Sequence, residues 1–91
     1  MNKKSIIEFM KIKGLEFIDF YKFDKKYYSI SFFNNCTYNN YIIDIRYTTV
    51  DKNYSILVKE NNGPLYVEAS RIYGGVRNLK KELINIINNQ Y

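Results

Sequence analysis

Residues 41–50 constrain the fold of this chain more than any other stretch. They read Tyr-Ile-Ile-Asp-Ile-Arg-Tyr-Thr-Thr-Val, are mostly β-branched or aromatic, and include neither Gly nor Pro. Apolar and polar residues alternate along them with the period of two that is typical of a strand with one buried and one partly wet face. The sequence therefore predicts a central strand whose core face carries Ile43, Ile45 and Tyr47 and whose outer face carries Asp44, Arg46 and Thr48.

Four further strand-like runs flank this stretch, at residues 15–23, 27–33, 54–60 and 65–72. The segments between the five runs are short and rich in turn-forming residues. Short connections favour antiparallel neighbours, because parallel pairing needs a long crossover. We therefore expect a five-stranded antiparallel meander with residues 15–23 and 65–72 at its edges.

Side-chain alternation assigns faces in the two edge strands less clearly than in the central one. In residues 15–23 it places Phe17, Tyr21 and Phe23 on one face and Ile18 and Phe20 on the other. In residues 65–72 it directs Leu65, Val67 and Ala69 towards the core.

A helix is predicted at each end of the meander. Ser5 and Glu8 have the spacing of a capping box before an apolar run, so a helix over residues 6–13 is expected, with Gly14 ending it. Ile7 and Ile12 widen its apolar face, which predicts that most of it is covered. Residues 76–89 have an apolar sector at helical spacing. Gly74 and Gly75 precede them and favour a sharp strand-to-helix turn. The prediction is an α+β domain with both helices on one sheet face and the other face open.

Length and composition narrow the function classes. The chain has 91 residues, which predicts a single domain over 1–91, and it carries a net charge of +5, which favours acidic or polyanionic partners. It has no His and a single cysteine, Cys36, which argues against catalysis, metal and cofactors. Without a leader-like or membrane-spanning apolar run, we expect a cytoplasmic protein with no membrane contact.

The open sheet face is the first candidate for a binding surface. Tyr and Arg are over-represented among interface hot spots, because they combine contact area with a polar end. The predicted partner-binding residues are Arg46, Lys59, Tyr66 and Tyr27. The 10 tyrosines of the chain are equally what the codon usage of an AT-rich genome and packing at the margin of a core would produce. Both interpretations stay open.

The last helix offers a second candidate surface. Its start, Gly-Gly-Val-Arg-Asn-Leu-Lys-Lys-Glu-Leu over residues 74–83, resembles the glycine and paired lysines of the double-stranded RNA-binding domain, which also has a helix, an antiparallel meander and a final helix. The resemblance implies nucleic-acid contacts, with Lys80 and Lys81 on phosphates. The basic residues Arg71 and Arg77 flank the same helix start. The alternative is a solvated helix face.

In size, expected architecture and composition the chain is similar to small accessory proteins of phages and mobile elements, including anti-CRISPR proteins. That resemblance implies a non-enzymatic inhibitor or regulator that binds a host protein or a nucleoprotein complex, as a monomer or homodimer. A nucleic-acid-binding module, with RNA or DNA contacts, and a structural or assembly oligomer are the alternative hypotheses.

Overall fold

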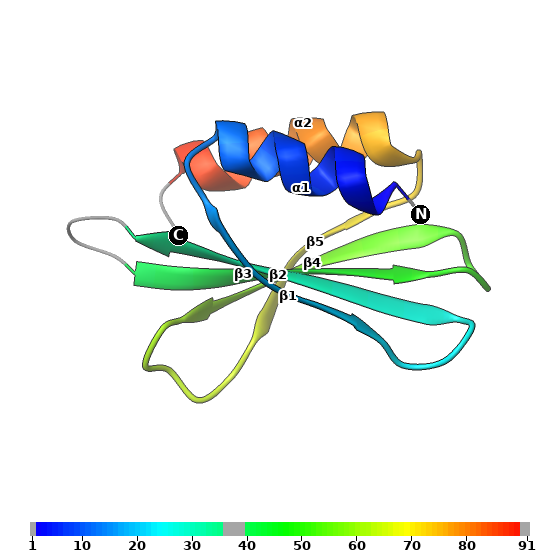
Figure 1. Ribbon diagram of the computed structural model, residues 1–91, viewed down its shortest axis with the longest axis horizontal. Helices are drawn as coiled ribbons and strands as arrows, with labels where there is room; N and C mark the ends of the chain where they lie inside the picture. The colour runs from blue at the N-terminus through cyan, green and yellow to red at the C-terminus, as the bar shows by residue number, and fades with distance from the viewer. Residues whose placement is uncertain (1, 36–39, 90–91) are drawn as a thin grey trace.

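The computed structural model describes residues 2–35 and 40–89, where two helices lie on one face of a five-stranded sheet (Figure 1). Each strand pairs antiparallel with its neighbour along the chain, in the order β1-β2-β3-β4-β5, which confirms the α+β meander with β1 and β5 at its edges. Cys36 lies outside the described residues. The elements are α1 (Lys3–Ile12), β1 (Glu16–Lys22), β2 (Tyr27–Asn35), β3 (Asn40–Thr48), β4 (Asn53–Glu60), β5 (Val67–Ile72) and α2 (Val76–Asn88).

The middle strand β3 is the centre of the hydrophobic core, as its alternation predicts. Ile45 lies opposite Ile30 of β2 and Ile56 of β4, and all three side chains are fully buried. β-Branched side chains in such cross-strand rows pack well against one another on a pleated surface. The sheet therefore presents a continuous apolar face to the helices.

The two helices cover this apolar face together, and Figure 1 shows them side by side above the sheet. From α1, Ile6 and Met10 enter the core, and from α2, Leu79, Leu83 and Ile86 do so. Their spacing of three or four residues places each set on a single helical face. The prediction that both helices share one sheet face is confirmed, and no described helix covers the opposite face.

The start of α1 differs from the sequence prediction. The helix begins at Lys3, and its N-cap is Asn2, which makes no capping hydrogen bond through its side chain. Ser5 lies inside the first turn, and its hydroxyl accepts a hydrogen bond from the Lys80 amine at 2.8 Å. The capping-box prediction is therefore wrong, because the helix already begins at Lys3 and Ser5 is not its N-cap. Ile12, expected to be covered, is 82% exposed at the end of the helix.

A β-bulge in β1 changes the predicted faces of that strand. Phe17 lies opposite Phe32, but Asp19 lies opposite Ser31, so Ile18 is the extra residue. Phe17 and Phe20 consequently both pack against the core. The grouping of Phe17 with Tyr21 and Phe23 is wrong, since Tyr21 is 56% and Phe23 60% exposed.

Leu65 and Val67, both predicted to be directed towards the core, are exposed. β5 begins at Val67, and the exposed fractions are 75% for Leu65 and 67% for Val67. Val67 lies opposite Val58 and so shares its face of the sheet. Figure 1 shows the β4–β5 hairpin bending away from the helices, so neither helix covers its end. Ala69, the third predicted residue, does pack against the core.

Candidate functional site

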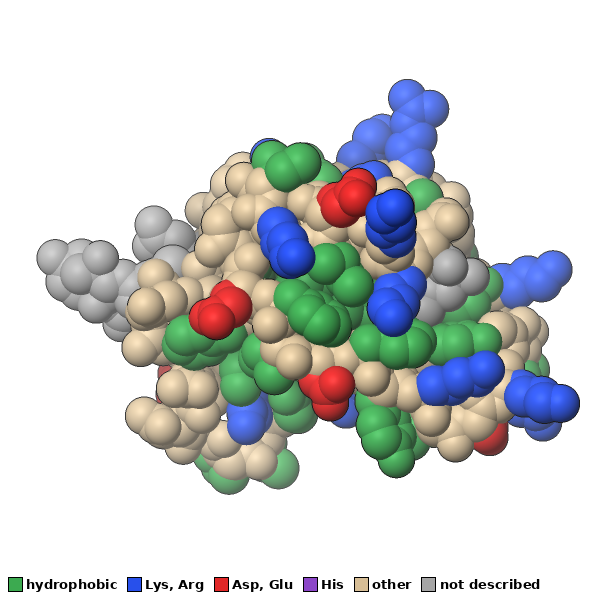
Figure 2. All heavy atoms as spheres, viewed as in Figure 1, with side chains coloured by type: hydrophobic (Ala, Val, Ile, Leu, Met, Phe, Trp, Pro, Cys, Tyr) green, Lys and Arg blue, Asp and Glu red, His purple; other side chains and the backbone are tan. Residues whose placement is uncertain are grey.

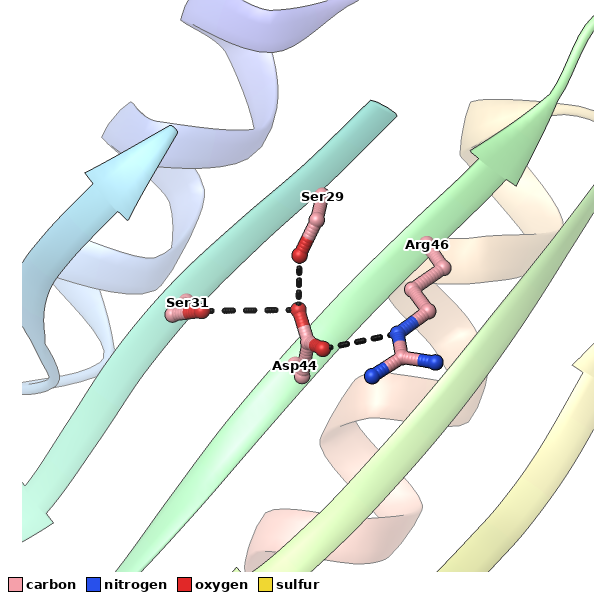
Figure 3. Close-up of polar contacts among 4 residues, drawn as sticks. All are labelled: Ser29, Ser31, Asp44 and Arg46. Atoms are coloured by element: carbon pink, nitrogen blue, oxygen red, sulfur yellow. Dashed lines mark hydrogen bonds and ion pairs between the residues drawn. The ribbon is translucent and has the colours of Figure 1, made fainter. Parts of the chain in front are cut away.

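The most unusual group of the uncovered sheet face is a buried carboxylate. Asp44 points outward from the middle of β3, yet its side chain is only 5% exposed. Its Oδ1 accepts hydrogen bonds from the hydroxyls of Ser29 and Ser31, which lie on the neighbouring strand β2 (Figure 3). A buried carboxylate is costly unless hydrogen bonds compensate it, and these two serines provide that compensation.

The second oxygen of this carboxylate holds Arg46. The Nε of Arg46 donates to Oδ2 of Asp44 at 2.8 Å, while 46% of the arginine side chain remains exposed. Figure 3 shows one terminal nitrogen of the guanidinium on the side of the carboxylate and the other turned away from it. The ion pair is therefore half buried, and it fixes the orientation of a guanidinium that remains partly exposed.

Tyr66, in the loop before β5, lies close to both Arg46 and Lys59. Its ring centroid lies 5.8 Å from the Arg46 guanidinium carbon and 5.3 Å from the Lys59 amine. Burial raises the pKa of Tyr66, and the negative charge of Asp44 raises it further, while the charge of Arg46 acts in the opposite direction. Tyr66 is 37% exposed, so a neutral phenol with part of its ring open stands beside two cations.

A groove of about 340 Å³ adjoins Arg46 at the end of the sheet. One wall is formed by Phe23 and Tyr27 where β1 turns into β2. Arg46 and Thr48 of β3 and Asn53 and Ser55 of β4 are also part of its lining. The groove therefore combines exposed aromatic rings with hydrogen-bonding side chains beside a guanidinium.

The structure brings together three of the four predicted partner-binding residues. Arg46, Lys59 and Tyr66 form one cluster, and Tyr27 lies in the groove that Arg46 also lines. Sequence reasoning missed the pairing of Ser29 and Ser31 with Asp44. The signal available for it is the Ser-x-Ser alternation, which places both hydroxyls on one face of a strand adjacent to β3.

The basic residues predicted for nucleic acid do not form one cluster of free cations. Arg71 donates from Nε to Glu68 at 2.9 Å, and this bond, followed by one with Tyr73, raises the pKa of Arg71. Lys80 bonds Ser5 and lies 5.5 Å from the Phe9 ring centroid. Arg77 and Lys81 are exposed on α2. The sheet has more strands than the double-stranded RNA-binding domain, which further separates the two architectures.

Comparison of the chain with protein-family models, curated proteins and solved structures finds no match. Within residues 2–35 and 40–89, neither helix has the length and apolar character needed to cross a membrane. The same residues include no group of three or more Cys, Asp or Glu placed to hold a metal ion.

Proposed function

We propose that this chain is a small non-enzymatic binding protein whose uncovered sheet face docks onto a host protein or nucleoprotein complex. The arrangement that supports the proposal is the cluster of Arg46, Lys59 and Tyr66 above the buried Asp44. A guanidinium fixed before binding loses less side-chain entropy when it meets an anion. Tyrosine and arginine in such a position are typical binding hot spots.

The finer part of the proposal is that the chain acts as an inhibitor or regulator of the kind that phages and mobile elements encode. Its small size, AT-rich residue usage and helix–meander–helix order resemble the anti-CRISPR proteins. With a net charge of +5, such an inhibitor would bind acidic protein surface or guide RNA in preference to a DNA channel.

Affinity capture tests the proposal. The full chain is immobilised and exposed to a nuclease-treated lysate of its native host, and retained proteins are identified by mass spectrometry. We expect to capture a partner protein. Tyr66→Ala and Arg46→Ala should each lower the affinity for it by more than about tenfold, as hot-spot truncations do. Tyr73→Ala is the matched control, since Tyr73 is an exposed tyrosine in the connection between β5 and α2.

Two results would contradict the proposal. One is the absence of any retained protein, with or without nuclease. The other is a partner that binds the two cluster variants as well as it binds the Tyr73→Ala control. A concentration-independent oligomer in light scattering would instead favour the structural or assembly hypothesis.

A further inference from the structure

The groove at the β1–β2 end of the sheet has the chemistry of a site for an unstacked nucleobase. Its exposed rings are Phe23, 60% exposed, and Tyr27, 51% exposed. Thr48 and Ser55 supply hydrogen-bond donors and acceptors of the kind that read the edge of a base. Its volume of about 340 Å³ is at the lower end of the range for small-ligand pockets, which suits one planar ring system.

Backbone hydrogen bonds fix the walls of this groove. The N–H of Phe23 donates to the carbonyl of Tyr27 at 3.0 Å, and the N–H of Thr49 donates to the carbonyl of Lys26 at 2.9 Å. The turn between Phe23 and Tyr27 is closed further by Asp24, whose carboxylate accepts the Lys26 N–H at 2.6 Å. The aromatic wall and the end of β3 are therefore held together before any ligand binds, which lowers the entropic cost of binding.

Positive charge surrounds the same end of the sheet. Exposed lysines occupy the end of β1, the β1–β2 turn and the β3–β4 turn, where residues 22–27 and 49–52 carry four lysines against two aspartates. Figure 2 shows Lys and Arg side chains gathered towards the half of the molecule that carries these turns. Lysines of this kind attract phosphates without reading sequence. They are Lys22, Lys25, Lys26 and Lys52.

We propose that this groove binds single-stranded nucleic acid, with one base stacked on Tyr27 and Phe23 and neighbouring phosphates held by Arg46 and the turn lysines. The inference deepens the proposed function, on which it rests, by assigning the nucleic-acid part of a nucleoprotein partner. Stacking platforms beside flexible cations are how proteins hold single strands with little sequence preference. Duplex nucleic acid does not fit this chemistry, because its bases are stacked and their faces are hidden.

Fluorescence anisotropy with a labelled oligouridylate of about 12 nucleotides tests this proposal, with oligothymidylate as a second arm. We expect binding whose affinity falls about 20- to 50-fold between about 50 and 200 mM salt, as three or four phosphate contacts on a single strand would give. Tyr27→Ala should weaken binding about 5- to 140-fold through lost stacking. Tyr27→Phe keeps the ring and should bind like the wild type, which makes it the matched control. Comparison of the two arms shows whether the 2′-hydroxyl contributes.

Three results would overturn the inference: no oligonucleotide binding at low salt, equal weakening by Tyr27→Ala and Tyr27→Phe, or equal affinity for a duplex of the same length. The proposed binding of a protein partner is tested independently of these oligonucleotide measurements. If the inference fails while a protein partner survives nuclease treatment and is lost with Tyr66→Ala, the protein-binding proposal stands. Circular dichroism of each variant shows that the fold is retained.

Discussion

Arg46 reaches the uncovered face of the sheet while its Nε donates to the buried Oδ2 of Asp44 at 2.8 Å. The two residues are separated by one position on β3, so both point to the same face. This contact converts a long, flexible side chain into an oriented donor. The cluster with Tyr66 and Lys59 depends on that orientation.

Asp44→Ala should destabilise the fold by about 1–3 kcal/mol, because the hydroxyls of Ser29 and Ser31 lose their buried acceptor and Arg46 loses its ion pair. Urea unfolding measures this cost. Glu68→Ala is the matched control, since it removes a carboxylate from an exposed arginine pair and should change stability by less than about 1 kcal/mol. If the two substitutions lower the free energy of unfolding equally, the burial of Asp44 does not add to stability.

Alkaline pH should destabilise the protein through Tyr54. Burial raises its pKa, the neighbouring Tyr47 raises it further, and a backbone hydrogen bond with Asn2 acts in the opposite direction. The unfolded chain therefore loses this proton first as pH rises, so unfolding becomes easier above about pH 10, the ordinary tyrosine value. Below that pH the contribution to stability is fully present.

Unfolding by urea at a series of pH values from neutral to alkaline checks this effect. Tyr54→Phe removes the titrating group and should flatten the fall in stability above about pH 10. Tyr27→Phe is the control, because Tyr27 is half exposed. A decline that remains unchanged in Tyr54→Phe would assign the alkaline transition to other groups.

The sequence predicts the order and pairing of the elements, because short connections leave antiparallel neighbours as the simple solution. It also predicts the core of β3, since Ile43 and Ile45 alternate with polar residues. It does not predict the bulge at Ile18, because an extra residue in a strand depends on pairing with β2 and leaves no local composition signal.

The site is predicted less completely than the fold for a related reason. Alternation identifies Arg46 and Lys59 as outward residues, but it does not place Tyr66 over both of them, because Tyr66 belongs to a loop outside any strand. Burial of Asp44 on an otherwise open face depends on two serines from a neighbouring strand. Likewise, Ser5 has a capping spacing, yet its hydroxyl bonds Lys80, 75 positions along the chain. Local sequence patterns do not predict long-range contacts of this kind.

Ile6 and Ile12 lie on the same helix but differ completely in burial, at 0% and 82% exposed. Ile6→Ala should cost about 2–5 kcal/mol, since it opens a cavity between the helices and the sheet. Ile12→Ala should change the free energy of unfolding by less than about 0.5 kcal/mol, as surface substitutions usually do. Chemical denaturation of both variants measures the difference, and similar costs would contradict the observed end of α1.

Gly75 adopts φ 88° and ψ −173° at the N-cap of α2, a backbone region that only glycine enters at little cost. Gly75→Ala should therefore destabilise the protein by about 1–3 kcal/mol. Because the strain lies at the junction of β5 and α2, the pairing of the sheet should persist. Thermal unfolding measures the loss, and an unchanged midpoint would mean that this junction tolerates a side chain.

Lys80 joins the two helices, since its amine donates to Ser5 at 2.8 Å and lies near the ring of Phe9. Lys80→Ala should therefore cost about 0.5–1.5 kcal/mol through the lost hydrogen bond and cation–π contact. Lys81→Ala is the matched control on the exposed face of α2 and should leave stability unchanged. Urea unfolding separates the two variants. If Lys80→Ala retains full stability but abolishes binding to double-stranded RNA, Lys80 is a phosphate contact. Its hydrogen bond with Ser5 then contributes nothing to the stability of the fold.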